Sequence, residues 1–343
     1  MSDIKLSVII PTYNAAKYIE QAVQSVISGL YGVPVEEKPV EILIMDDGST
    51  DDTGALCDDI AERFRDEKCL IKVIHQENRG HGGAINAGVD VCEGRYFIIL
   101  DADDTLSPDG LGVLLEKLSD DTSDMIICGE DRRHEDTREI EHYRMPAELT
   151  TGRKILQADL KFVTDNWNTG LRHLFTMHNM VFCTEFYRNL FLRLPEKVFY
   201  DDAYYYVVAA AFARSITFID SVLYIYRLGG ADQSVAVDNR VKRIDQHGKV
   251  IDAILNEYGK AERAGQAAFL YYRSRLSGVV TDYFVTALLR DRDRKQGRKN
   301  AKLMMDKIGG RDIPRLKRNY RVLFIMNLLH MGEKQFDRLI GRK

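Results

Sequence analysis

Three carboxylates follow a short apolar run in the stretch YFIILDADDTLSPD, which spans residues 96–109. Asp101, Asp103 and Asp104 lie so close together that their charges repel one another unless a cation offsets them. An Asp-x-Asp pair at a strand end offers the hard oxygen ligands that suit Mg²⁺ or Mn²⁺, and these ions commonly share their coordination shell with phosphates. The stretch therefore predicts a site for a metal and a diphosphate, with Asp101 and Asp103 as its carboxylates.

The same stretch also has the features of a helix start. Ser107 precedes Pro108, and a serine followed by proline is typical of an N-cap and the first helical position. We expect Ser107 to cap this helix and Asp104 to have a structural role. Because Asp-x-Asp often occurs by chance, the tripeptide needs support from the rest of the chain.

Strand–turn–helix units surround these residues. Apolar runs at 5–10, 40–45, 69–76 and 94–100 are each followed by a polar loop, and the segments after the first three loops have helical spacing or acidic helix starts. This alternation predicts an α/β fold, with a mainly parallel sheet that is covered by helices on both faces.

The polar loops of these units are expected to meet at one edge of the sheet, because ligands of such sheets lie beyond the carboxyl ends of the strands. The loops are PTYN at 11–14, DDGSTDD at 46–52, NRGHGG at 78–83 and DADD at 101–104. Their convergence is the main structural prediction, because unrelated surface loops need not share an edge.

The alternation weakens beyond about Asp124. MIICG at 125–129 and SITFIDSVLYIYRL at 215–228 favour strands, whereas ILQADLKFVTDN at 155–166 and TEFYRNLFLRL at 184–194 favour helices. From residue 239 onward the chain is charged and has helical spacing. We therefore expect a first domain at 1–238 and a basic helical region at 239–343.

Composition and charge bound the class of protein. The 343 residues are 45% hydrophobic, and the five cysteines contain no C-x-x-C pair, which favours a reduced globular protein in the cytoplasm. No signal peptide or membrane span is expected. Residues 241–343 hold 24 Lys and Arg against 11 Asp and Glu, so this region suits an anionic partner, either a membrane surface or an acidic patch on the protein itself. The alternative is a solvated helical surface.

In this order and spacing, the motifs SVIIPTYN, MDDGSTDDT, ENRG and GRYFIILDADDTLSPD resemble the N-terminal half of family 2 glycosyltransferases. The resemblance is specific over about the first 110 residues and continues more loosely through FYDDAYYYV and YIYR. It implies a GT-A fold, with a Rossmann-like nucleotide-binding half at 1–110, an acceptor-binding half at 111–238 and a C-terminal helical extension.

The resemblance also implies roles for particular residues. Pro11 and Tyr13 would contact the nucleotide base, with Tyr13 as a stacking ring, and Asp47 would accept a hydrogen bond from a uracil or thymine edge. Asp101 would approach the ribose or diphosphate, and Asp103 would bind the metal. The alternative is that Tyr13 is part of the hydrophobic core and that Asp47 only stabilises a turn.

The catalytic base implied by the resemblance is Asp202, the second acid of FYDD, with Asp201 as a neighbour or helix cap. Transfer to a hydroxyl with inversion requires such a base, because the hydroxyl loses its proton as the new bond forms. The alternative is that both acids begin a helix. A synthase that uses polyprenyl phosphate as acceptor would not need this base.

Some features depart from the common family pattern. Ala84-Ile85-Asn86 stands where many members have Ala-Arg-Asn, so His81 or the backbone of the glycine loop would have to contact the diphosphate. The Q-x-x-R-W motif of processive synthases is absent, and Arg227 of YIYR binds phosphate or pairs with an acid. The segment from Trp167 to Phe182, which includes His173 and His178, is expected to line the acceptor pocket, although a single Trp or His is more often part of a core.

The sequence thus predicts an inverting, metal-dependent glycosyltransferase with a nucleotide-sugar donor, and it favours a UDP-sugar. The expected acceptor is a glycan or a lipid-linked molecule in the synthesis of a cell-surface or exopolysaccharide. The basic C-terminal region is expected to contact an anionic membrane, and no nucleic acid is expected as a partner. A scaffold that binds nucleotide-sugar without catalysis is the rival from another class. A G-x-G-x-x-G motif does not follow the first strand, which argues against an NAD dehydrogenase.

Overall fold

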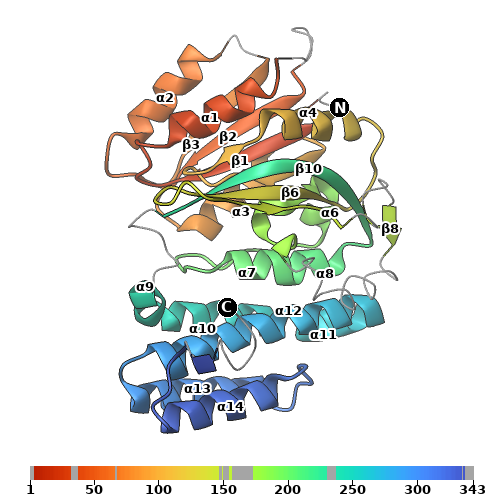
Figure 1. Cartoon of the computed structure of the whole chain (residues 1–343). Helices are drawn as coiled ribbons and strands as arrows, with labels where there is room; N and C mark the ends of the chain where they lie inside the picture. Colours follow the sequence, from red (N-terminus) through yellow and green to blue (C-terminus); the bar gives the residue numbers. More distant parts are fainter. Residues whose placement is uncertain are drawn as a thin grey trace. The chain divides into compact units, whose positions relative to one another are not determined.

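The computed structural model describes residues 4–31, 38–65, 68–146, 149, 154–156, 173–229, 237–333 and 335–336. The chain forms two compact units (Figure 1). The first comprises Met1–Lys197 and Phe212–Gly230, and the second comprises Val198–Ala211 and Ala231–Lys343. The predicted domain boundary at residue 238 and the predicted nucleotide-binding and acceptor-binding halves stay predictions. The segment Val198–Ala211 lies before that boundary in the sequence but belongs to the second unit.

The first unit is built on one sheet in the order β3-β2-β1-β4-β9-β6-β10-β5, with β7 beside β6 and β8 beside β10. Its strands are β1 (Leu6–Thr12), β2 (Val40–Asp46), β3 (Cys69–His75), β4 (Tyr96–Ile99), β5 (Thr105–Leu106), β6 (Met125–His134), β7 (Ile140–Tyr143), β8 (Lys154–Leu156), β9 (Met180–Cys183) and β10 (Ser215–Leu228).

The first four strands are parallel, and β1 lies between β2 and β4. Every residue of β1, β2 and β4 is buried, which explains why these strands appear in the sequence as continuous apolar runs. Strands β6 and β10 are also parallel, whereas β9 is inserted between β4 and β6 in the opposite direction. The predicted mainly parallel sheet is confirmed.

Helices cover both faces of this sheet (Figure 1). The helices α1 (Ile19–Ser28), α2 (Thr53–Arg63) and α4 (Pro108–Lys117) lie on one face, and α3 (His81–Val91) and α6 (Thr184–Asn189) lie on the other. Gly88 brings α3 close to β1, because a Cβ there would lie 2.5 Å from Ile9 Cγ2. The expected cap of α4 is confirmed, since Ser107 Oγ accepts a hydrogen bond from the Gly110 N–H at 3.3 Å.

The later part of the chain follows the sequence predictions in part. Strand β10 covers the whole predicted segment 215–228, β6 includes MIICG, and α6 lies within the predicted helix at 184–194. The predicted helix at 155–166 is wrong at its start. Ile155 and Leu156 belong to β8 because their backbones pair with Ile216 and Ser215 of β10, and residues 157–166 lie outside the described residues.

The described residues of the second unit are largely helical, as expected from residue 239 onward. The helices are α7 (Asp202–Tyr204), α9 (Val237–Lys242), α10 (Ile244–Asn256), α11 (Tyr258–Arg263), α12 (Gln266–Val285), α13 (Arg294–Ile308) and α14 (Leu316–Leu328), with π-helical turns at Tyr205–Ala209 and Thr286–Arg290. The short α8 (Ala210–Phe212) spans the change of unit. Among the helices searched in the described residues, none has the length and apolar character needed to cross a bilayer.

Candidate functional site

The four predicted loops meet at the carboxyl ends of β1 to β4. Asn14 connects the first two loops, because its side-chain oxygen accepts a hydrogen bond from the Thr50 N–H at 2.8 Å and its N–H donates to Ser49 Oγ at 3.0 Å. His81, after β3, lies 3.1 Å from the carboxylate of Asp101, after β4. The predicted convergence of the loops on one edge of the sheet is therefore confirmed.

Asp47 holds the second and third loops together. Its buried carboxylate accepts hydrogen bonds from Gln76 Nε2 at 2.6 Å, the Arg79 N–H at 2.8 Å and the Gly80 N–H at 2.7 Å. A carboxylate has about four acceptor positions, so one is left for a further donor. The role of Asp47 toward a nucleotide base stays a prediction.

Pro11 and Tyr13 lie at the end of β1. Pro11 is buried within the strand and lies opposite Met45 of β2. Tyr13 is half exposed, so its ring is not part of the core. An exposed ring beside the loop edge is accessible for stacking, and the two base-binding roles stay predictions.

Asp104 is a structural residue, as the sequence predicts. Its buried carboxylate accepts a hydrogen bond from the Tyr224 hydroxyl at 2.8 Å and one from the Arg227 N–H at 2.8 Å. Burial raises the pKa of Asp104 well above its usual range, and the charges of Asp101 and Asp103 raise it further. Because both oxygens already accept hydrogen bonds from β10, Asp104 ties this strand to the carboxylate loop.

Asp103 is held much more loosely. Its side chain is 41% exposed, and its carboxylate lies 3.9 Å from the Arg227 guanidinium. Burial raises the pKa of Asp103, and the charge of Asp101 adds to this effect. A partly exposed carboxylate that is repelled by a neighbouring carboxylate is well suited to a cation from solution.

Asp101 contacts two histidines from different parts of the chain. His81 Nε2 lies 3.1 Å from Oδ1, and His178 Nε2 lies 3.7 Å from Oδ2. Burial alone would raise the pKa of Asp101, but His178 and His81 hold it well below its usual range. Asp101 is therefore ionised and lies against two imidazoles, whereas Asp103 lies near the Arg227 guanidinium and is partly exposed.

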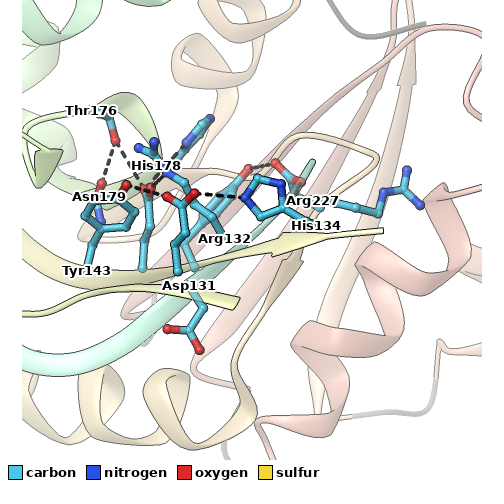
Figure 2. A network of polar contacts seen from close by, with 12 residues as sticks. Asp131, Arg132, His134, Tyr143, Thr176, His178, Asn179 and Arg227 are labelled. Atoms are coloured by element: carbon cyan, nitrogen blue, oxygen red, sulfur yellow. Dashed lines mark hydrogen bonds and ion pairs between the residues drawn. The ribbon is translucent and has the colours of Figure 1, made fainter. Parts of the chain in front are cut away.

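His178 has a role that the sequence did not predict, because its segment was expected to line an acceptor pocket. The imidazole is stacked between the rings of Tyr224 and Tyr226, with both centroids at 4.6 Å. Figure 2 shows His178 in a network of polar side chains that includes Arg132 and Thr176. The Nδ1 of His178 lies 3.8 Å from the fully buried carboxylate of Glu130. Burial disfavours the cation, but the nearby carboxylates of Asp101 and Glu130 raise the pKa of His178 to about 10.

Glu130 is placed at the centre of this polar network by β6. It lies 2.5 Å from Arg132 Nε, and the Thr176 hydroxyl approaches it at 3.5 Å. Burial would raise the pKa of Glu130, but its contacts with His178 and Arg132 lower it. A buried glutamate directly after the apolar run MIICG was the signal in the sequence that could have indicated a hidden charged partner.

Arg227 pairs with acids, which is one of the two roles left open from the sequence. Its Nη1 lies 3.2 Å from Glu135, and its guanidinium lies over the Tyr18 ring at 3.9 Å from the centroid. Together with the contact to Asp103, these neighbours place a cation beside the carboxylate of Asp103.

The predicted base lies in the second unit. Asp202 is the first residue of α7, and Asp201 is buried directly before it, without a hydrogen bond from its side chain to cap the helix. Each unit is described by itself, so the catalytic role of Asp202 stays a prediction. Trp167 lies outside the described residues.

The described residues fit a divalent cation. Oxygens of Asp101 and Asp104 and a nitrogen of His178 lie within 4.8 Å of one another, and Asp103 extends the same loop. The oxygens of Asp104 are engaged with β10, and His178 is stacked against two tyrosines. The assignment of the metal to Asp103 stays a prediction. Carboxylate oxygens are the ligands that Mg²⁺ and Mn²⁺ prefer.

Solved structures share this fold. S. aureus TarS, residues 1–349, in complex with UDP-GlcNAc has a TM-score of 0.59 at 18% identity, with 96% of this chain and 93% of that chain covered. The mannosyltransferase PcManGT from Pyrobaculum calidifontis, in complex with GDP-Man and Mn²⁺, has a TM-score of 0.51 at 17% identity, with 94% and 84% covered. The predicted GT-A type fold is confirmed.

Sequence comparison identifies the family. The glycosyltransferase GlyG of Streptococcus pneumoniae is 34% identical over 128 residues, which are 37% of this chain and 39% of GlyG. The chain covers 35% to 60% of the length of the first four curated relatives that it matches. The model of "Glycosyl transferase family 2" matches residues 7–191, more than half of the sequence, and the chain therefore belongs to this family.

Proposed function

We propose that the protein is an inverting glycosyltransferase that transfers a sugar from a nucleotide-diphosphate donor, with UDP-sugars favoured, to a hydroxyl group of a glycan or lipid-linked acceptor. The observation that carries this proposal is the state of Asp103. It is a partly exposed carboxylate with a raised pKa at the edge where the loops of β1 to β4 meet. Cell-surface or exopolysaccharide synthesis is the process that suits such a transfer.

The donor is proposed to lie across the loop edge. Tyr13 offers an exposed ring for the base, and Asp47 has one acceptor position left for a base N–H. Asp101 is ionised and faces the ribose or diphosphate in this proposal, and the imidazole of His81 lies beside it, where it can approach phosphate oxygens. The titles of the TarS and PcManGT structures name UDP-GlcNAc and GDP-Man, which supports a nucleotide-sugar as the donor.

A metal is proposed to be held by Asp103, with Asp101 behind it, and the Mn²⁺ named for PcManGT supports this choice. When bound, Mg²⁺ or Mn²⁺ would offset the charge that develops on the departing diphosphate. Asp202 is proposed to take the proton from the acceptor hydroxyl as the sugar is transferred.

The first test is donor binding. Titration calorimetry with UDP-sugars, GDP-sugars and Mn²⁺ should show metal-dependent binding of one donor class. Asp103→Asn should weaken that binding by at least about tenfold, because a neutral amide is a poor ligand for a hard cation. Asp120→Asn is the matched control, since Asp120 is an exposed aspartate in the same unit, and it should bind as the wild type does.

The second arm of this test separates the reaction types. Asp202→Asn should abolish transfer to a hydroxyl acceptor while it leaves donor binding unchanged, because the loss of a general base typically costs 10²–10⁴-fold in rate. Full activity of Asp202→Asn with polyprenyl phosphate would instead support the synthase. Donor binding without transfer or hydrolysis in any condition would support the scaffold.

A further inference from the structure

Helix α14 exposes a row of large apolar side chains. Val322, Ile325, Leu328 and Leu329 are 41%, 55%, 52% and 65% exposed, respectively. Val322, Ile325 and Leu328 are spaced three residues apart on one face of the helix, and Leu329 follows directly as its C-cap. Because these side chains are exposed, the second unit does not need them to fill its core.

The opposite side of α14 fixes the helix within its unit. Leu323 and Met326 are buried, and Asn327 Nδ2 donates a hydrogen bond to the Leu288 carbonyl at 2.6 Å. Asn319 donates to the Thr281 hydroxyl at 3.1 Å. The exposed apolar row is therefore presented by an anchored helix, and an apolar row of this kind on a fixed surface indicates an interaction site.

Cations extend the same face toward the start of the helix. Lys317, Arg318 and Arg321 are exposed, and α14 contains no acidic residue. In the described part of the chain, no ion pair is recorded for any of these three side chains. Residues 294–328 hold 11 Lys and Arg against 2 Asp and Glu, so the surrounding surface is also positive.

The combination of an apolar row and unneutralised cations decides the kind of partner. An anionic bilayer surface offers phosphates for the cations and an acyl boundary for the apolar side chains, and a helix that lies flat on it can use both. A second copy of this face would offer apolar side chains but no anions, and would leave the cations without counter-charge.

We propose that the α14 face, defined as Lys317, Arg318, Arg321, Val322, Ile325, Leu328 and Leu329, docks on an anionic membrane surface. The sequence predicts membrane contact for the whole basic region at 239–343, and this proposal assigns that contact to one helix. Its purpose rests on the proposed function, since a lipid-linked acceptor would lie in that membrane, but the binding itself does not depend on catalysis.

The test uses the full chain and sedimentation with vesicles of phosphatidylcholine, alone or mixed with phosphatidylglycerol. The wild type should bind the mixed vesicles and should bind less as salt is raised. A variant with Lys317, Arg318 and Arg321 changed to Gln should bind on the order of 100-fold more weakly, because each cation near the surface contributes roughly fivefold. Changing Val322, Ile325 and Leu329 to Ser should reduce binding by at least about tenfold, including at high salt.

Matched controls keep the result interpretable. Val113→Ser replaces a side chain of α4 that is 44% exposed, and it should bind vesicles as the wild type does. Circular dichroism checks the fold, and Ile325→Ser alone is the milder variant, with weaker binding also expected.

Three outcomes would overturn the proposal. These are a wild type that does not bind mixed vesicles, variants that bind as well as the wild type, and a dimer that the Ser variant converts to monomer without any vesicle binding. Donor binding is measured separately in calorimetry. If the protein binds the donor but does not bind vesicles, the membrane proposal fails and the proposed function stands. If it binds vesicles but does not bind the donor, the proposed function fails and the membrane proposal stands.

Discussion

The aspartates of the DADD run are chemically identical but have different surroundings. Asp104 is fixed by hydrogen bonds from β10, Asp101 lies against two histidines, and Asp103 is partly exposed beside Arg227. The chain turns at these residues, with the Asp104 N–H donating a hydrogen bond to the Asp101 carbonyl at 3.0 Å, so neighbouring side chains point in different directions. One residue can therefore serve the fold while the next faces the solvent.

The charge of His178 is expected to stabilise the fold. His178→Phe keeps an aromatic ring between Tyr224 and Tyr226 but leaves the buried Glu130 without one of its cations. Breaking a buried ion pair from one side leaves an uncompensated charge, so we expect a loss of about 3 kcal/mol in the free energy of unfolding. Urea denaturation measures it.

A double-mutant cycle provides the control for this prediction. The double variant Glu130→Gln, His178→Phe should lose less free energy of unfolding than the sum of the losses in the two single variants. Each single change leaves one charge unpaired, and the double variant removes both charges. Strict additivity would contradict a direct interaction between the two side chains.

At this scale the sequence predicts residues whose partners are local. Ser107 could be assigned as a cap because its partner, Gly110, lies three residues away. The contacts of His178 could not be predicted, because they join residues that are far apart in the chain and come from β6, β10 and the loop after β4. The isolated histidine carries no pattern that distinguishes this environment from an ordinary core.

At the scale of elements, α4 approaches β10 so closely that only glycine fits at one position. A Cβ on Gly110 would lie 1.8 Å from the carbonyl oxygen of Val222, whereas a Cβ on Gly112 would meet nothing within 4 Å. The start of α4 is therefore seated against the strand that also holds Asp104.

Two glycine substitutions on α4 should thus have opposite effects. Gly110→Ala forces backbone apart and should lower the free energy of unfolding by roughly 2–3 kcal/mol. Gly112→Ala, the matched control, should be neutral or stabilising by up to about 1 kcal/mol, because alanine is the better helix former in open space. Thermal denaturation of both variants measures the difference, and equal melting temperatures would contradict the close approach.

Element types were largely predictable because hydrophobic periodicity marks them directly. Strand β10 and the first β-α units are examples. The insertion of β9 between β4 and β6 was not predictable, since its short run MVFC carries no information about its partners or direction. Strand pairing across the sheet depends on contacts between residues that are distant in the sequence, and one sequence alone does not show which strands pair.

At the scale of the whole molecule, stability in acid should depend on a buried histidine of the second unit. His247 is 6% exposed and lies between the rings of Tyr200 and Tyr283. Burial lowers the pKa of His247 to about 4, although the charge of Asp282 opposes this shift. The unfolded chain, with an ordinary pKa near 6.5, therefore takes up the proton first as pH falls.

The sign of the effect follows from this order. Below about pH 6.5 the unfolded state gains a proton that the folded state does not bind until about pH 4, so stability is lost as the pH falls through this window. Between pH 7 and pH 4.5, the free energy of unfolding of His247→Phe should fall by about 2 kcal/mol less than that of the wild type. Urea denaturation at both pH values measures it. The exposed His330 supplies the control, and His330→Gln should lose as much free energy of unfolding between these pH values as the wild type does. If His330→Gln reduced this loss as much as His247→Phe does, the assignment to His247 would be refuted.

The carboxylate of Asp47 has a consequence for engineering. It already accepts hydrogen bonds from Gln76, Arg79 and Gly80, so any neutral replacement would leave those donors short of an acceptor. An attempt to change base preference by one substitution at this position would also loosen the turn that presents His81. A redesigned selectivity would therefore require a new turn sequence together with the new side chain, and libraries that vary both at once are the sensible starting point.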